Sequence, residues 1–281
     1  MSLRRVLVST AIWLAVLSFL PGAASAAVPR GFTVPRGIPV LMYHHLAPKE
    51  IASKARHAVV VTPEVFEAQM SYLKRNGYTA ITTRDLASHL LDGGSLPARP
   101  VLITLDDGYE SNYVYVFPLL KKYNMKATIF AITGMITDER RQFNPAVATH
   151  LTWAQVSEMA GSGLVEFASH SANLHFVDAK RRYGMDAVTP ASLEQDLRES
   201  ARAIKEKTGI QPVAFAYPYG YYRKAYKEAI QRVGFRVAFT IHEGEVRKGD
   251  NPMELNRITI YPYHTDLDRV LRARTCRFLP F

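Results

Sequence analysis

Two short segments of this sequence carry side chains from which a catalytic metal site can be built. Residues 104–108, Thr-Leu-Asp-Asp-Gly, hold two adjacent carboxylates, and residues 169–175, Ser-His-Ser-Ala-Asn-Leu-His, hold two histidines. Catalytic zinc sites have three protein ligands and leave a fourth position to water, whereas structural zinc sites close all four positions, usually with cysteine. The chain has one cysteine, Cys276. The two segments therefore predict a catalytic divalent metal.

Both segments follow apolar runs that are typical of buried strands, residues 100–105 and residues 164–168. Gly108 turns the chain after the first run. In α/β barrels the catalytic residues lie at the carboxyl ends of strands. An Asp-Asp-Gly sequence alone is also typical of an ordinary turn. The combination of the two segments is what indicates a site.

Roles for these side chains follow from the geometry of a strand end. Adjacent side chains point in different directions there, so one aspartate can hold the metal while its neighbour faces the bound water. We expect Asp107, His170 and His175 to be the metal ligands and Asp106 to be the general base. One carboxylate with two imidazoles favours Zn²⁺, and Ni²⁺, Co²⁺ or Mn²⁺ are alternatives.

The motifs resemble those of the polysaccharide deacetylases of carbohydrate esterase family 4, and the resemblance covers residues 39–260. The five-residue step from His170 to His175, and Pro-Val-Leu-Met-Tyr-His-His at residues 39–45, are similar to the branch that includes the bacterial poly-β-1,6-N-acetylglucosamine de-N-acetylases. The resemblance implies a metal-dependent hydrolase that removes N-acetyl groups from a β-linked N-acetylglucosamine polysaccharide. Alternatives are a deacetylase of peptidoglycan, chitin oligomers or an O-acetylated glycan, or a non-catalytic carbohydrate-binding protein with the same fold.

The resemblance also implies a general acid. His44 stands where the poly-N-acetylglucosamine branch carries its proton-donating histidine. A core histidine bonded to the backbone is the alternative interpretation. The commoner branch takes its acid from a Leu-x-His motif near the C-terminus, so His242 and His264 are further candidates, although neither lies in that motif.

The Pro-Tyr-Gly motif at residues 218–220 matches a third motif of the family. The resemblance assigns the backbone N–H of Tyr219 to binding the oxyanion. Ala216 stands where the commoner branch has an arginine that holds the catalytic base. The sequence therefore leaves the group that orients Asp106 unidentified.

Three tyrosines near the motifs are candidates for contact with sugar rings: Tyr109, Tyr221 and Tyr222. Tyrosine presents a broad apolar ring with a polar hydroxyl, which suits a sugar face. The same residues also serve as packing residues with solvated hydroxyls.

The N-terminus has the pattern of a secretory signal peptide. Arg4 and Arg5 precede an apolar stretch at residues 6–20, and Ala-Ser-Ala at residues 24–26 is a small-residue cleavage site. We expect cleavage before Ala27, which gives a signal peptide of residues 1–26 and a catalytic domain of residues 27–281. An uncleaved anchor is disfavoured, because a span needs about 20 apolar residues. The mature protein is expected to be periplasmic, secreted or on the cell surface.

Charge constrains the partners of the mature chain. Its net charge falls from +10 to +8 once the two arginines of residues 1–26 are removed. A basic exported protein is suited to weak attraction to an anionic envelope surface, or its charge serves solubility alone. No nucleic-acid-binding motif is present, so we expect the polysaccharide and not a nucleic acid to be the partner.

Apolar runs that alternate with helical segments predict one α/β domain with a parallel sheet. The residues alone fit a β/α barrel or an open doubly wound sheet, and the resemblance implies a distorted β/α barrel of the polysaccharide deacetylase type. The expected strands are residues 40–43, 79–81, 101–105, 127–132, 164–168, 213–217, 237–241 and 257–260.

Capping signals predict four of the helices. One begins at Thr62-Pro63 and ends at Gly77, and a second begins at the capping box of residues 152–155. A third is expected from Ser192 to Gly209, and a fourth spans residues 223–233. Residues 176–190, which follow the second histidine, are either a lid or a surface loop.

Overall fold

The computed structural model describes residues 37–54, 59–139 and 141–275. All of them belong to one compact unit. The expected signal peptide, residues 1–26, and Cys276 lie outside the described residues. Within these residues, no helix has both the length and the apolar character that crossing a membrane requires.

Eight strands form one sheet in the described part of the chain, and every pairing between them is parallel. All eight expected strands are present, with some ends shifted by one or two residues. The strands are β1 (Val40–Tyr43), β2 (Thr79–Ile81), β3 (Pro100–Asp107), β4 (Ala127–Ala131), β5 (Val165–Ser169), β6 (Ala214–Ala216), β7 (Val237–Glu243) and β8 (Leu255–Thr259).

The sheet closes into a barrel through its first strand, because β1 pairs with both β8 and β3. Leu102 of β3 is paired with Val40 of β1 and also with Ile81 of β2, so β1 and β2 flank β3 on opposite edges. The ring therefore contains β1 and β3 to β8, and β2 lies outside it. Between β5 and β6 only Ser169 and Phe215 are paired. The predicted distorted β/α barrel is confirmed.

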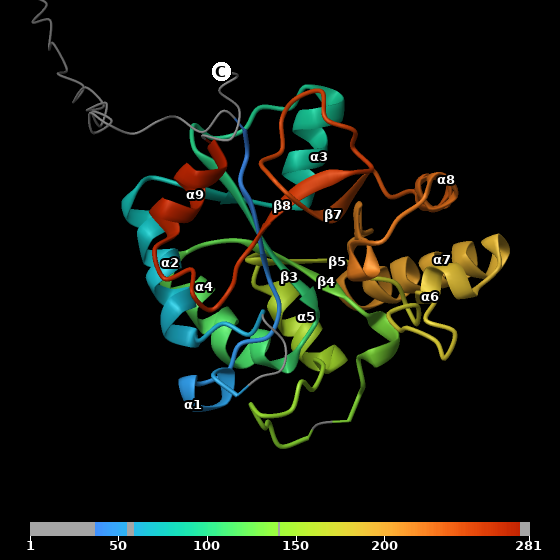
Figure 1. The fold of residues 1–281 in the computed structure, drawn as a ribbon, viewed down its shortest axis with the longest axis horizontal. Helices are drawn as coiled ribbons and strands as arrows, with labels where there is room; N and C mark the ends of the chain where they lie inside the picture. The colour runs from blue at the N-terminus through green and yellow to red at the C-terminus, as the bar shows by residue number, and fades with distance from the viewer. Residues whose placement is uncertain (1–36, 55–58, 140, 276–281) are drawn as a thin grey trace, which may run out of the picture. The chain divides into compact units, whose positions relative to one another are not determined.

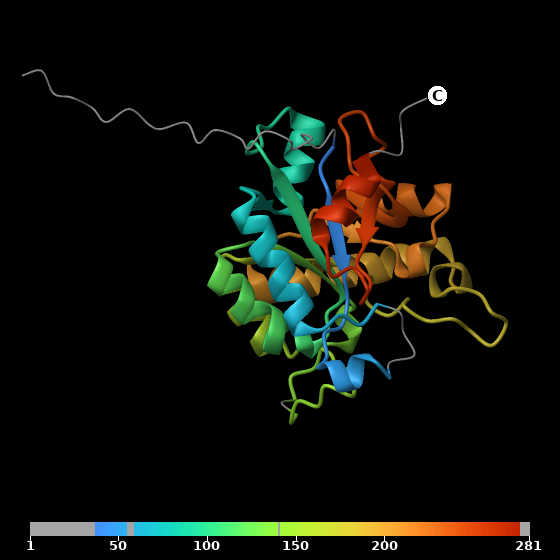
Figure 2. The ribbon, with the colours of Figure 1, turned by 60° about the vertical axis from the view of Figure 1, so that its left-hand side comes forward.

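Helices surround the barrel (Figure 1, Figure 2). They are α1 (Lys49–Ala52), α2 (Pro63–Arg75), α3 (Thr83–Asp92), α4 (Phe117–Tyr123), α5 (Trp153–Gly161), α6 (Gly184–Ala187), α7 (Pro190–Thr208), α8 (Lys224–Val233) and α9 (Leu267–Thr275). Short turns of other helix types are η1 (Asn112–Val116), η2 (Thr133–Met135) and η3 (Pro218–Gly220).

Most of the predicted helix ends hold, and one is corrected. The capping box at the start of α5 forms as expected between Thr152 and Gln155. Helix α7 begins earlier than predicted: its N-cap is Thr189, whose hydroxyl accepts a hydrogen bond from the N–H of Ser192. Pro190 at the first helical position has the backbone angle that a helix needs and loses no hydrogen bond there. Thr189-Pro190 is thus a better start signal than Ser192.

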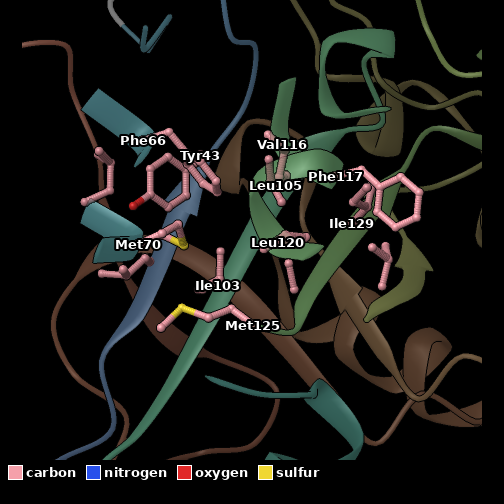
Figure 3. Packing of buried hydrophobic residues seen from close by; sticks show 14 of the residues in the cluster. Tyr43, Phe66, Met70, Ile103, Leu105, Val116, Phe117, Leu120, Met125 and Ile129 are labelled. Carbon is pink, nitrogen blue, oxygen red and sulfur yellow. The ribbon is translucent and has the colours of Figure 1, made fainter. Parts of the chain in front are cut away.

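The main apolar core lies between the barrel and the helices packed against β1, β3 and β4. In Figure 3, Phe66 and Met70 of α2 face Tyr43, and Leu120 of α4 lies beside Leu105. These side chains are essentially removed from water. Burial of each large apolar side chain stabilises the fold by about 1.5–3 kcal/mol.

Alternation along each strand divides the side chains between this outer core and the barrel interior. On β3, Ile103 and Leu105 belong to the outer core, while Leu102 belongs to a second cluster with residues of the opposite strands. Thr104 and Asp106 share the interior face with Leu102. On β8, Leu255 belongs to that second cluster, so Arg257 also points into the barrel.

Candidate active site

The three expected metal ligands lie together at the carboxyl ends of β3 and β5. The Oδ1 atom of Asp107 is 3.4 Å from Nε2 of His170 and 3.4 Å from Nε2 of His175. One ligand atom from each residue lies within 4.8 Å of the other two. Asp107 Oδ1 is buried and has no hydrogen-bond partner among the described residues. A divalent cation fits this position, because it would satisfy a carboxylate oxygen that the protein leaves without a donor.

His170 is oriented by a second contact. Its Nδ1 lies 2.8 Å from the backbone oxygen of Ala216. A carbonyl oxygen only accepts, so Nδ1 carries the proton in the neutral ring, and the lone pair of Nε2 is then directed toward Asp107. Metal-binding histidines usually have such a partner on the other ring nitrogen. The arrangement therefore favours metal binding through Nε2.

The electrostatics of this cluster favour a positive charge. Burial alone would raise the pKa of Asp107, but His170, His44 and His175 hold it well below its usual range. Burial would lower the pKa of His170, whereas Asp107 and Asp106 raise it above its ordinary value. Burial and the neighbouring His170 lower the pKa of His175 to about 4. Metal ligands must be deprotonated, so a bound cation would replace the protons.

The loop between the two histidines is held by a carboxylate from α7. The two side-chain oxygens of Asp196 accept hydrogen bonds from the backbone N–H groups of Ala172 (2.8 Å) and Asn173 (2.7 Å). Asp196 is buried. The carboxylate thereby fixes the loop that carries His175 relative to His170.

Replacement of Asp196 by asparagine is expected to weaken metal binding by about 10- to 100-fold, the usual cost of losing a group that supports a ligand. The amide puts an NH₂ group against one of the two backbone donors. Competition with a chelating dye measures the affinity, and circular dichroism checks the fold. Glu199→Gln, an exposed carboxylate on the same helix, is the matched control. An unchanged metal affinity in the Asp196 variant would contradict the positioning role.

Asp106 is held by an arginine that sequence reasoning did not identify. Nη1 and Nη2 of Arg257 donate to Oδ1 and Oδ2 of Asp106, both at 2.7 Å. Nε of Arg257 donates to the backbone oxygen of Thr240 at 2.9 Å, and the arginine side chain is fully buried. Burial alone would raise the pKa of Asp106, but the adjacent Arg257 holds it below its ordinary value. Asp106 is therefore ionised at neutral pH.

His44 lies beside the same carboxylate, with Nε2 3.9 Å from Oδ2 of Asp106. Burial lowers the pKa of His44, although Asp106 and Asp107 oppose this effect. The two other candidates for the acid, His242 and His264, are not among the residues that line the groove around this site. His242 packs against Tyr222, and His264 packs against Tyr261 and Tyr263.

A groove of about 840 Å³ contains the assembled side chains. His44, Asp106, Asp107, His170 and His175 all line it. Apolar residues form other parts of its wall, among them Val60, Pro145, Ala146 and Ile241. The groove is large enough for a small-molecule substrate or part of a polymer.

The backbone around the ligands is strained. Asp107, Ser171 and Tyr219 have positive φ angles of 73°, 74° and 58°. Such conformations cost about 1–3 kcal/mol each in residues other than glycine and are typical of functional sites. The ring of Tyr219 stacks on His175, with centroids 4.3 Å apart. The Pro-Tyr-Gly motif is therefore in direct contact with His175, one of the expected metal ligands.

The three candidate tyrosines differ in position. Tyr109 lines the groove, and burial, with a smaller effect of Asp107, raises the pKa of its hydroxyl. Tyr221 and Tyr222 are not among the lining residues. The Tyr221 hydroxyl accepts hydrogen bonds from Arg223, and the Tyr222 hydroxyl donates to Glu254 at 3.2 Å.

The fold is a parallel β/α barrel with a cluster of carboxylates and histidines at the carboxyl ends of its strands. This arrangement is typical of barrel enzymes. A family model described as polysaccharide deacetylase matches residues 93–238, slightly more than half of the chain. The chain belongs to the polysaccharide deacetylase family. The expectation that the chain is a polysaccharide de-N-acetylase is confirmed as a family assignment.

Relatives and solved structures agree with this assignment. The chain is 29% identical over 228 residues to a "putative polysaccharide deacetylase YxkH" of Bacillus subtilis, covering 81% of this chain and 73% of that protein. It is 28% identical over 200 residues to a poly-β-1,6-N-acetyl-D-glucosamine N-deacetylase of Staphylococcus aureus, covering 71% and 67%. The solved structure of IcaB from Ammonifex degensii matches with a TM-score of 0.72 and 27% identity, covering 86% and 98%.

Proposed function

We propose that this chain is a metal-dependent hydrolase that removes N-acetyl groups from a β-linked N-acetylglucosamine polysaccharide, with poly-β-1,6-N-acetylglucosamine favoured. The observation that carries the proposal is one groove in which Asp107, His170 and His175 converge beside an ionised Asp106 and His44. The linkage is supported by the relative from Staphylococcus aureus, whose name states that substrate.

Asp107, His170 and His175 would hold one divalent ion, with zinc favoured by the donor set and Ni²⁺, Co²⁺ or Mn²⁺ as alternatives. When bound, such an ion polarises the acetyl carbonyl and makes its water more acidic. The buried Oδ1 atom of Asp107, which has no hydrogen-bond partner among the described residues, supports the assignment.

Asp106 is proposed to take the proton from the attacking water. Arg257 keeps the carboxylate ionised and fixes its plane through two hydrogen bonds. We propose that Arg257 orients the base, the role that an arginine at the position of Ala216 has in the commoner branch. A positioned general base contributes about 10²- to 10⁴-fold to the rate.

The remaining steps concern the oxyanion and the leaving amine. The N–H of Tyr219 is proposed to donate to the oxyanion, and one such donor is worth about 3–4 kcal/mol in the transition state. Burial lowers the pKa of His44, so His44 is largely neutral before the reaction. We propose that the proton from water passes from Asp106 to His44 and then to the departing nitrogen. The first products are acetic acid and the free amine, and the acid proton then passes to the amine, so that acetate and the ammonium form of the sugar leave and no proton is left on the protein.

We propose that Tyr109, of the three candidate tyrosines, contacts the substrate; its position in the wall of the groove beside Asp107 supports this. For location, we propose that residues 27–281 act outside the cytoplasmic membrane after removal of the signal peptide. Net charge of +8 on that chain suits weak attraction to an anionic envelope surface.

The test of the proposed function is amine release by the zinc-loaded chain 27–281 from β-1,6- and β-1,4-linked N-acetylglucosamine oligomers. Asp106→Asn serves as the blank. A preference for β-1,6 oligomers supports the proposal. A preference for β-1,4 oligomers would assign the enzyme to peptidoglycan or chitin, and release no greater than the blank would indicate another acyl substrate or a binding role.

Removal of the metal is expected to abolish amine release, and one equivalent of Zn²⁺ is expected to restore it. The physical reason is that the poorly electrophilic acetamide depends on the ion for polarisation. The measurement is activity after treatment with a chelator and dialysis, with metal content followed by elemental analysis. Full activity in metal-free protein would contradict the mechanism.

A further inference from the structure

The loop that follows β8 presents an exposed aromatic surface that the proposed mechanism does not use. Tyr263 is 71% exposed. Its ring stacks on Tyr261 with centroids 5.2 Å apart and planes inclined by 4°. His264 packs edge-on against both rings. We refer to Tyr261, Tyr263 and His264 as the aromatic platform.

Hydrogen bonds hold the platform to the barrel. The side-chain amide of Gln69 in α2 donates to the backbone oxygen of His264 at 2.6 Å. The other end of the same amide accepts a hydrogen bond from the hydroxyl of Tyr43 in β1. The N–H of His264 donates to the backbone oxygen of Tyr261 at 2.9 Å. A surface that is already ordered loses less entropy when it binds a ligand.

A hollow of about 360 Å³ adjoins the platform. Tyr263, His264, Thr265, Asp266 and Arg269 are among the residues that line it. An aromatic ring beside charged and hydroxyl side chains offers what a sugar ring needs, an apolar surface for its C–H face and hydrogen-bonding groups for its hydroxyls. The volume is within the roughly 300–1,000 Å³ of small-ligand sites.

The platform rises from the same edge of the barrel as the catalytic groove. Thr259 of β8 is paired with Met42 of β1, and the N–H of Ile260 donates to the backbone oxygen of Met42 at 3.0 Å. The chain therefore leaves β8 at the level at which β1 continues to His44. Figure 1 and Figure 2 both show the loop between β8 and α9, in red, beside β1 and α2.

We propose that the aromatic platform is an accessory sugar-binding site, which takes a pyranose unit of the same polysaccharide at a distance from the acetyl group that is hydrolysed. This inference rests on the proposed function. The loop after β8 leaves the barrel at the same edge as the catalytic groove, and this shared edge favours a further unit of the polysaccharide over a protein or a lipid as the occupant. The site would strengthen binding of long chains and leave the chemical step unchanged.

The experiment compares the wild-type chain 27–281 with Tyr263→Ala on N-acetylglucosamine oligomers of increasing length, in the linkage that the enzyme prefers. The KM for a hexamer is expected to rise about three- to tenfold, the effect of losing one aromatic contact. The kcat for the hexamer and both constants for the dimer are expected to stay unchanged. Tyr263→Phe keeps the ring and is expected to behave as wild type.

Binding is measured independently of turnover. Hexamer and dimer are titrated into Asp106→Asn protein with and without Tyr263→Ala, and hexamer binding alone is expected to weaken. Equal effects on dimer and hexamer, or none, would overturn the accessory site even if the enzyme is active. No amine release by wild-type protein, together with hexamer binding that depends on Tyr263, would refute the proposed function and leave the sugar site supported.

Discussion

Replacement of Asp106 by asparagine is expected to lower the rate of amine release by about 10²- to 10⁴-fold while the protein keeps its metal. The amide cannot accept the proton of the attacking water. Asp106 makes its strongest contacts with Arg257 and not with the histidines, so its loss removes no metal ligand. Rates and metal content are measured on the same purified sample.

Asp107→Ala and His170→Ala are the matched comparison, because they are expected to lose both metal and activity. Asp107 supplies the oxygen that faces His170 and His175. Asp106→Asn also leaves an NH₂ group against the buried guanidinium, so each variant is first shown to be folded by circular dichroism. Equal loss of metal from all three variants would refute the division of roles between the two aspartates.

Much of this site was predictable because its signals are local. Apolar runs followed by Asp-Asp-Gly and by Ser-His mark strand ends, and parallel strands bring their carboxyl ends to one edge. Each part of the cluster of Asp107, His170 and His175 can therefore be recognised within a few residues of sequence.

The partner of Asp106 was not predictable in this way. Arg257 lies 151 residues further along the chain, and only closure of the barrel brings the two together. One signal was present. Arg257 is two residues from Leu255, so both side chains lie on the same face of the strand and point into the core. A buried cation needs a partner of opposite charge. The apolar pattern predicts a strand that begins at Arg257, which leaves Leu255 outside the strand and hides this alternation.

The positions of the tyrosines show a similar limit. All three candidate tyrosines lie close to a motif in the sequence, but only Tyr109 among them lines the groove. The hydroxyls of Tyr221 and Tyr222 are hydrogen-bonded to Arg223 and Glu254. Side-chain direction at the end of a strand depends on the turn that follows, and the turn at Tyr219 has a positive φ. Such a conformation is unusual for tyrosine and has no clear sequence signal.

Replacement of Arg257 by methionine is expected to destabilise the fold and abolish activity. It leaves Asp106 as a buried charge without its cation, which costs about 3–5 kcal/mol when one partner of a buried ion pair is removed. For a domain of this size the melting temperature is expected to fall by about 10 °C. Metal-free protein is used for the melting curves, because bound metal would add its own stabilisation.

The double variant Arg257→Met with Asp106→Asn separates stability from catalysis. It removes both buried charges, so the melting temperature is expected to recover part of the loss, while activity stays absent because the base is gone. Arg257→Lys keeps the charge but cannot form the paired hydrogen bonds, and it is expected to retain more stability than activity. Two results would contradict a stabilising ion pair between Arg257 and Asp106. One is an Arg257→Met variant with the melting temperature of wild type. The other is a double variant whose melting temperature is no higher than that of Arg257→Met. The expected pattern would instead mean that a buried arginine on β8 keeps the base ionised and aligned, in place of an arginine at position 216.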